Sequence, residues 1–243
     1  MSGHSKWHNI QKTKGAQDAK RAAAFTKIAK ELIVAVKEGG GITDPANNSR
    51  LATIITKAKA ANMPNDNIKR CLEKAAGAGG GDNYESIQYE GYGPGGVAVI
   101  VETATDNRNR TAPEVRHALS KFGGNMGTTG CVSFMFSEKG VIVVDNEDGD
   151  VDEDQLMDDA LEAGAGDILT EEGAFEVYTE PSDFAAVCEA LSAKGYKFLS
   201  ADLEKVPASY VELNEEQAVA MQKMLDMLEE NDDVQNVFHN WDE

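Results

Sequence analysis

The spacing of hydrophobic residues changes once along this chain, at the glycine-rich run GAGGG (residues 77–81), and this change restricts the fold more than any other feature. Before the run, Phe25, Ile28, Leu32 and Val36 recur three or four residues apart, which is the period of an amphipathic helix. After it, short apolar and β-branched segments are separated by glycine turns, which is typical of strands. The sequence therefore predicts an α+β protein, with helices first and sheets second.

The first part is predicted to be a bundle of three helices. The first helix begins near residue 16 and ends at three glycines, residues 39–41. Asp44, followed by proline, is predicted to be the N-cap of the second helix, and a third helix begins at Pro64. Because each helix has one apolar face, the three can share a core. Residues 1–78 are therefore expected to form a basic helical domain, joined to the rest by a flexible glycine linker.

The second part is predicted to contain two ferredoxin-like α+β domains, one inserted in the other. Residues 139–206 show the full β-α-β-β-α-β order of such a domain. The flanking segments, residues 82–138 and 207–243, are expected to form one discontinuous α+β domain, because each half reads as β-α-β. The first half is predicted to hold a strand over 97–103, a helix over 113–122 and a strand over 131–136, and the second a strand over 209–213, a helix over 215–228 and a strand over 234–239.

Charge is divided unequally between the two parts. Residues 1–76 contain eleven Lys and three Arg against six Asp and Glu, a balance of +8. The whole chain has a formal charge of −19, so the remaining 167 residues carry −27. Such asymmetry favours a basic part that contacts a polyanion while the acidic part stays away from it. The alternative is a lysine-rich helical face that is only solvated.

The cations expected to contact nucleic acid come from an N-terminal arm and from the helices. In residues 1–15, lysines alternate with an indole that can stack on a base. Along the first helix, at about 100° per residue, the lysines point away from the apolar stripe. The candidate contacts in this domain are Lys6, Trp7, Lys12, Lys14, Lys20, Arg21, Lys27, Lys30, Lys37, Lys57 and Lys59.

A second basic site is predicted in the polar loop TDNRNRT (residues 105–111), which precedes a helix. Arg108 and Arg110 in this loop can contact a phosphate or an RNA backbone. Alternatively, the Asp and Asn side chains of the loop cap the helix, and both arginines pair with nearby carboxylates. The sequence leaves these two interpretations open.

No catalytic, cofactor or metal site is predicted, and the chain is not expected to be an enzyme. The turn GYGPGG (residues 91–96) lacks the GK[ST] ending of a phosphate-binding loop, so a structural turn is the stronger interpretation. The carboxylates of residues 145–154 do not follow EF-hand spacing and are expected to form a solvated acidic turn. Cys71, Cys131 and Cys188 lie far apart and are interpreted as small buried hydrophobes in a reducing cytosol.

Neither export nor a membrane partner is expected. No segment approaches the roughly 20 consecutive apolar residues that cross a bilayer. The N-terminus also lacks the charged, apolar and small-residue succession of a signal peptide. We therefore expect a cytoplasmic protein.

Seven long motifs resemble one known family. In chain order they are GHSKW (3–7), AQDAKR (16–21), FTKIAKEL (25–32), KAKAANMPNDNI (57–68), YEGYGPGG (89–96), TDNRNRT (105–111) and DMLEENDDVQNVFHN (226–240). With these motifs the chain resembles the YebC/PmpR family of probable transcriptional regulatory proteins, which is related to the mitochondrial translational activator of cytochrome c oxidase subunit I. The resemblance implies a cytoplasmic bacterial protein with three domains, the first helical. The first motif begins almost at Met1, so no organelle presequence is expected.

The resemblance implies two partners. The family has been described both as DNA-binding regulators and as ribosome-associated factors that help translation through proline-rich stretches. The main prediction is a DNA-binding transcriptional regulator of gene expression; the alternative is a translation factor that binds ribosomal RNA. Arg108 and Arg110, as a second basic site, favour RNA, and a net charge of −19 opposes a long duplex unless the basic bundle is held apart. The acidic domains are also expected to face other proteins.

Overall fold

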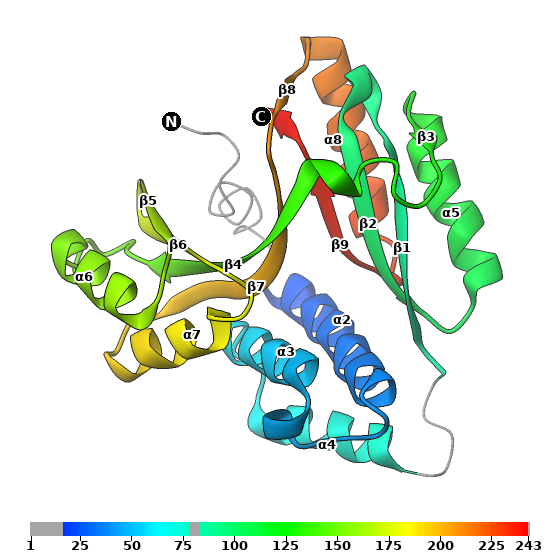
Figure 1. The fold of residues 1–243 in the computed structure, drawn as a ribbon. Coiled ribbons are helices and arrows are strands. Elements are labelled where there is room, and N and C mark those ends of the chain that lie inside the picture. Colours follow the sequence, from blue (N-terminus) through cyan, green and yellow to red (C-terminus); the bar gives the residue numbers. More distant parts are fainter. Residues whose placement is uncertain (1–16, 78–82, 243) are drawn as a thin grey trace.

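The computed structural model describes residues 17–77 and 83–242, with side chains from residue 22 onward. In Figure 1 the N-terminal helices lie beneath two separate sheet units, and β9, near the C-terminus, belongs to the first of these sheets. The fold is therefore α+β with the helices first, as the sequence predicts.

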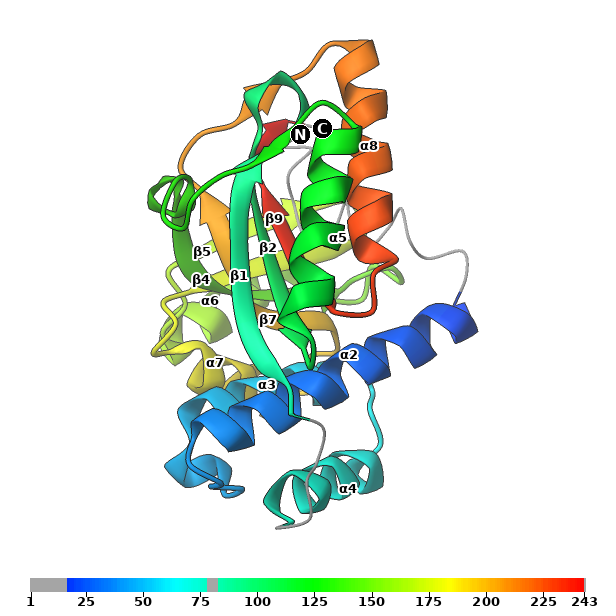
Figure 2. The same ribbon diagram turned by 90° about the vertical axis from the view of Figure 1, so that its right-hand side faces the viewer.

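Three helices form the N-terminal unit, called the helical unit below. They are α2 (Gln17–Glu38), α3 (Ser49–Ala60) and α4 (Asn65–Ala76). Leu32, Val36 and Leu51 are fully buried in their common core. Both α3 and α4 pack against α2, and Figure 2 shows α4 on the side of α2 that faces away from both sheets. The predicted three-helix bundle is confirmed.

The start of α3 differs from the prediction. Asp44 caps a short 3₁₀ turn, η1 (Pro45–Asn47), in which its carboxylate accepts a backbone N–H. The N-cap of α3 is Asn48, whose side chain accepts the Leu51 N–H and donates to the Ala35 carbonyl at 3.0 Å. An Asp-Pro pair suits the first turn of either helix type, so the sequence could not distinguish them.

The first sheet has the strand order β3-β1-β2-β9, and all its neighbours are antiparallel. Its elements are β1 (Glu85–Tyr92), β2 (Ala98–Thr105), α5 (Arg108–Lys121), β3 (Asn125–Met126), α8 (Glu215–Glu229) and β9 (Val234–His239). Both helices cover one face of the sheet (Figure 1). A ferredoxin-like sheet needs a fourth strand between β2 and β3, and β1 fills that position although it comes first in the chain.

One predicted strand of this unit is shorter than expected and another is mostly absent. Within 209–213 only β8 (Val211–Glu212) is extended, and it pairs in parallel with β10 (Trp241–Asp242) outside the main sheet. Most of 131–136 is a loop with a 3₁₀ turn, η3 (Ser133–Met135). The reason lies in Glu90 of β1, whose carboxylate accepts the N–H groups of Gly130, Val132 and Ser133 at 2.9, 3.0 and 2.9 Å. These N–H groups are therefore not available to a strand partner.

Helix α5 begins at Arg108, earlier than the predicted start at residue 113. Asn107 is the N-cap, and its side chain accepts the Arg110 N–H at 3.2 Å. Pro113 lies inside the helix. The prediction placed the start at this proline because proline is frequent at the first helical position.

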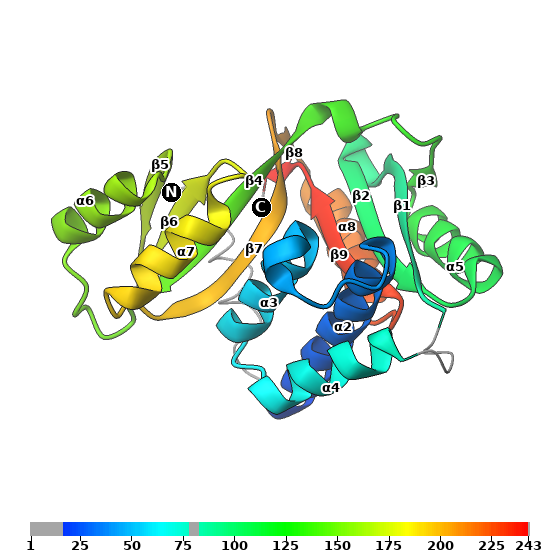
Figure 3. The same ribbon diagram turned by 60° about the horizontal axis from the view of Figure 1, so that its bottom comes forward.

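The second sheet has the strand order β5-β6-β4-β7. Its elements are β4 (Phe136–Asp145), α6 (Glu153–Ala163), β5 (Asp167–Glu171), β6 (Ala174–Thr179), α7 (Phe184–Ala193) and β7 (Phe198–Pro207). This is the predicted β-α-β-β-α-β order, and both helices share one core with the sheet. The chain enters this unit along β4 and leaves it along β7, and the two strands pair along their length (Figure 3). The first residue of β4, Phe136, lies opposite the last residue of β7, Pro207. That residues 139–206 form a domain of their own, with boundaries near 78, 138 and 206, stays a prediction.

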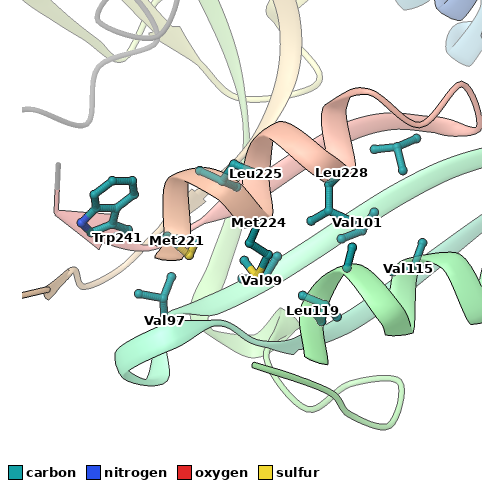
Figure 4. Close-up of a cluster of buried hydrophobic side chains, with 12 residues drawn as sticks. Val97, Val99, Val101, Val115, Leu119, Met221, Met224, Leu225, Leu228 and Trp241 are labelled. Atoms are coloured by element: carbon teal, nitrogen blue, oxygen red, sulfur yellow. The ribbon is translucent and has the colours of Figure 1, made fainter. Parts of the chain in front are cut away.

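An apolar core fixes the positions of α5 and α8 on the first sheet. Figure 4 shows Val99 and Val101 of β2 in one cluster with Leu119 of α5 and Met224 of α8. All four side chains are fully buried. Burial of each such side chain contributes about 1.5–3 kcal/mol, so the ends of both helices, and the loops attached to them, are held firmly by packing.

The glycine turn at residues 91–96 packs against α8. A Cβ atom added at Gly93 would lie 2.9 Å from the Met221 sulfur. Gly95 has a φ of 68°, and a Cβ atom there would collide with Leu213. Only glycine fits both positions, so the turn serves packing, in agreement with its interpretation as a structural turn.

Candidate nucleic-acid interface

The lysines in the middle of α2 point toward the acidic part of the chain. Lys27 Nζ donates to the Glu229 carbonyl oxygen at 3.0 Å, and Lys30 Nζ donates to the Asp232 carbonyl oxygen at 2.6 Å. Both carbonyls belong to the segment EENDD, residues 229–233, which begins at the last residue of α8 and leads to β9; it is called the acidic turn below. In the middle of the positive face predicted for this helix, Lys27 and Lys30 are thus occupied by residues from the same chain.

Asp233 of the acidic turn joins α2 to α5. Its carboxylate accepts from Lys30 at 3.1 Å, from Arg110 at 2.6 Å and from the Thr111 hydroxyl at 2.8 Å. Only 5% of the side chain is exposed. Burial alone would raise the pKa of this carboxyl, but the hydrogen bonds from Arg110, Thr111 and Lys30 outweigh it and hold the pKa below its ordinary value. Asp233 is therefore an anion at neutral pH.

Lys57 of α3 is buried where all three units meet. Its Nζ lies 2.6 Å from Asp202 Oδ2 of β7 and 2.9 Å from Glu31 Oε1 of α2, and 17% of the side chain is exposed. Burial would lower the pKa of this ammonium, but Asp202 and Glu31 outweigh it and raise the pKa. Lys57, one of the predicted nucleic-acid contacts, therefore holds an internal ion-pair network.

The exposed cations of the helical unit lie elsewhere. Lys59 is on the exposed side of α3, and Lys69 and Arg70 are exposed on α4. Lys69 is 76% exposed, and its nearest carboxylate, on Glu73, is 3.9 Å away. Arg70 donates to Asn67 Oδ1 at 2.8 Å within the same helix. We call Lys59, Lys69 and Arg70 the outer cations.

Two of the outer cations are absent from the predicted contacts. The helical period of the sequence already pointed Lys69 and Arg70 away from the core. What the sequence could not show is that Lys27, Lys30 and Lys57 are occupied by contacts from distant segments. Lys37 shares features of both sets: it is exposed like the outer cations, but its ammonium donates to Asn83 Oδ1 and to the Tyr84 carbonyl.

The arginines of the 105–111 loop are paired with carboxylates. Arg108 Nη2 lies 2.9 Å from Glu85 Oε2, and Arg110 Nη2 lies 3.0 Å from Asp106 Oδ1 and 2.6 Å from Asp233 Oδ2. These contacts, together with the Asn107 cap, fit the second interpretation of the loop. Three carboxylates surround two guanidinium groups, so the loop does not form a separate positive site.

Six predicted contacts are not placed. Lys6, Trp7, Lys12 and Lys14 lie outside the described residues, and Lys20 and Arg21 are described only as backbone in α2. All six stay predictions.

A cleft of about 770 Å³ lies beside the contact between α2 and the acidic turn. Lys30, Arg110 and His117 line it, with Met227 and Leu228 among its apolar contacts. Its lining carboxylates are Asp106, Glu114, Glu230, Asp232 and Asp233. Five carboxylates against one ammonium and one guanidinium disfavour an anionic ligand, so the cleft is not a phosphate site.

The described residues show no constellation for metal chemistry and no spanning helix. Within 17–77 and 83–242, no group of three or more His, Cys, Asp or Glu side chains converges as a metal site. No helix of that part is long and apolar enough to cross a membrane. The three cysteines are unpaired, but only Cys188 is buried, and burial raises its pKa to about 12. Cys71 and Cys131 are half-buried, which corrects their interpretation as buried hydrophobes.

Two family models match the chain. The model described as TACO1/YebC protein N-terminal domain matches residues 5–78, and the one described as TACO1/YebC second and third domain matches residues 84–241. Together they cover the helical unit and both sheet units.

Similar proteins carry one recurring name. A "Probable transcriptional regulatory protein" from Clostridium beijerinckii is 56% identical over 249 residues and covers 100% of both chains. Another with this name, from Geobacillus kaustophilus, is 53% identical over 243 residues, covering 100% of this chain and 98% of its own. The crystal structure of a conserved hypothetical protein from Aquifex aeolicus superimposes with a TM-score of 0.80, at 45% identity, covering 92% of this chain and 91% of that one.

Proposed function

The chain belongs to the TACO1/YebC family, and from that premise we propose that it is a transcriptional regulator that binds DNA through its helical unit. The observation that carries the proposal is the position of the outer cations, Lys59, Lys69 and Arg70, on a unit whose sequence has a balance of +8. Helix α4 lies on the side away from both sheets (Figure 2), so a polyanion can approach it without meeting the acidic units. The name of its relatives supports the regulatory role.

Binding of this kind rests on phosphate contacts. An exposed ammonium or guanidinium neutralises one phosphate and releases its counterion, which makes the affinity depend on salt. We expect the N-terminal arm, with Lys6, Trp7, Lys12 and Lys14, to add to this surface. We propose that the protein acts in the cytoplasm of a bacterial cell, and that it is a binding protein and not an enzyme. The acidic sheet units then face protein or solvent.

A competition experiment tests the proposal. Labelled duplex DNA and ribosomes are offered together to the protein near physiological salt and are separated by sedimentation. We expect the protein to remain with the DNA. If it travels with the ribosomes instead, the outer cations bind ribosomal RNA, and the protein is a translation factor that acts on proline-rich stretches.

Two charge-matched variants locate the surface. The variant Lys59→Gln, Lys69→Gln, Arg70→Gln is expected to lower the affinity for the bound polymer at least tenfold, because three phosphate contacts are lost. The control removes three exposed cations from α5 and α8 instead, as Arg116→Gln, Lys121→Gln, Lys223→Gln. Equal effects of the two variants would exclude the outer cations as the binding surface.

A further inference from the structure

The acidic turn offers α2 the same chemistry as a phosphate backbone. Two carbonyl oxygens and the Asp233 carboxylate receive the ammonium groups of Lys27 and Lys30 at 2.6–3.1 Å. Four of the five residues in the turn carry a carboxylate. Consecutive phosphates of a nucleic acid would use these same ammonium groups.

A phosphate cannot reach the Lys30 ammonium while the turn is in place, and the Lys27 ammonium is partly covered by the turn. Only 11% of the Lys30 side chain is exposed, and the Tyr84 ring lies 5.3 Å from its Nζ. We propose that the acidic turn is an internal competitor of nucleic acid for Lys27 and Lys30, so that tight binding requires α2 and the turn to separate. This inference rests on the proposed function, because it concerns the same basic unit.

The contact is polar enough to be reversible. The hydrophobic cores of the helical unit, the first sheet and the second sheet are separate clusters; in the described part Ala60 packs against the core of the second sheet, and Ile33 and Val34 of α2 are buried outside the helical core. Interfaces between units that are not large and hydrophobic allow relative motion. Charged contacts of this kind also weaken as the salt concentration rises.

The cost of burying the Lys27 ammonium is only partly offset while α2 and the acidic turn are in contact, which we call the closed arrangement. Burial lowers the pKa of its ammonium, and the opposing attraction of Glu229 and Asp232 does not fully restore it. A half-buried cation in this state gains when a phosphate with full negative charge replaces a backbone carbonyl. The outer cations are accessible in the closed arrangement as well, so they make the first contact and the α2 lysines strengthen it afterwards.

The first test weakens the turn without touching the Asp233 hydrogen bonds. In Glu229→Gln, Asp232→Asn both carboxylates that attract Lys27 become neutral. We expect the affinity for a labelled DNA duplex, measured by fluorescence anisotropy, to rise about threefold to tenfold. The matched control Asp148→Asn, Asp150→Asn makes the same charge change on exposed residues of the inserted segment, and its affinity should change less than twofold.

A double-mutant cycle separates competition from a general loss of repulsion. Lys30→Ala should change the affinity less than twofold in the wild-type background, because it removes a contact to the turn in the free protein and a contact to DNA in the complex, and the two losses offset each other. In the Glu229→Gln, Asp232→Asn background it should lower the affinity at least threefold, because Lys30 then contacts the duplex. Equal effects in both backgrounds would mean that the turn does not compete.

Hydrogen exchange gives a readout that does not depend on affinity. When duplex DNA is added to the wild-type protein, the amides of residues 229–234 should exchange faster, because α2 no longer covers the turn. Unchanged or slower exchange there, with DNA bound, overturns the inference and leaves the proposed function standing. If neither the wild type nor any variant binds DNA or ribosomes, both are wrong.

Discussion

Lys57 is the centre of an ion-pair network that joins the helical unit to the second sheet. Its ammonium faces the carboxylates of Glu31 and Asp202, which come from two different units. Burial raises the pKa of Glu31, against the attraction of Lys57, so this carboxylate is already costly to keep charged. The three groups stabilise the structure only as a set, because each charge that loses its partner stays buried.

Replacing Lys57 by alanine should lower the free energy of unfolding by about 3–5 kcal/mol, because two carboxylates that are only 13% and 15% exposed are left without this cation. The control is Lys59→Ala, at an exposed position two residues further along α3. It should change the free energy of unfolding by less than about 0.5 kcal/mol. Urea denaturation followed by circular dichroism measures both. Similar midpoints for the two variants would contradict the role assigned to Lys57.

Asp233 links stability to pH. Its pKa in the folded chain lies below the value of about 3.9 that an aspartate has when unfolded. The carboxylate therefore stabilises the fold fully above about pH 4 to 5, and this contribution is lost as the pH falls through the folded pKa.

Asp233→Asn should accordingly be less stable than the wild type at pH 7. The difference should shrink as the pH falls below about 4, since the wild-type side chain is then neutral as well. Thermal unfolding at a series of pH values checks this, with Asp148→Asn as a control at an exposed carboxylate. A difference that stays constant down to pH 2 would show that the charge of Asp233 is not what matters.

The candidate contacts could be found from the sequence only in part. Helical periodicity correctly placed Lys27 and Lys30 away from the core of their own unit, because that core is local. It could not place the acidic turn on them, because that contact joins residues about two hundred positions apart. Lys59 was predicted and is exposed, whereas Lys69 and Arg70 gain importance only once the covered lysines are known.

At the scale of elements, the loop that follows β3 is held by one glutamate of β1. Glu90 is 2% exposed, and it binds three backbone N–H groups of the loop. Burial alone would raise its pKa, but these hydrogen bonds lower it instead. The carboxylate thus replaces the strand partner that this segment lacks.

Glu90→Gln should destabilise the protein by about 2–3 kcal/mol, because an amide nitrogen cannot accept an N–H and at least one buried donor loses its partner. The amides of Gly130, Val132 and Ser133 should exchange faster with solvent. Glu85→Gln is the control, because Glu85 is on the same strand but 42% of its side chain is exposed and it pairs with the exposed Arg108. It should lower the free energy of unfolding by less than about 1 kcal/mol. Unaltered exchange in the Glu90 variant would disprove its role.

Elements with strong local signals were predictable, and elements set by distant partners were not. The start of α8 at Glu215 and the span of β9 agree with the prediction, because a capping asparagine precedes the helix and the strand contains two valines and a phenylalanine among polar residues. The order of the second sheet also follows from its own segment. The position of β1 between β2 and β3 depends on pairing across the whole first unit, and no local pattern records it.

At the scale of the whole molecule, charge is arranged along the chain from positive to strongly negative. Residues 1–76 carry +8, whereas residues 139–206 contain four Lys against nineteen Asp and Glu, a balance of −15. In Figures 1 and 3, α4 and α6 lie at different ends of the molecule. This separation of charge is expected to orient the molecule in the field of a polyanion, with the helical unit toward it, as the proposed function requires.

The salt dependence of the affinity for DNA should give the number of phosphate contacts. Three outer cations predict a slope of about −2.7 for the logarithm of affinity against the logarithm of salt concentration, and each additional phosphate contact adds about −0.9. Titrations at several salt concentrations measure this slope. A value flatter than about −1 would exclude three phosphate contacts, and the Lys59→Gln, Lys69→Gln, Arg70→Gln variant should lose most of the slope.

The pairing of β4 with β7 has a consequence for how such a chain can change over generations. Because Phe136 lies opposite Pro207, the backbone leaves the first unit and returns to it at neighbouring points. Loops within the seventy residues between them can lengthen or shorten while α8 and β9 keep their places, as long as Asp202 still pairs with Lys57. The acidity of this segment can then evolve separately from the surface that we propose to bind DNA.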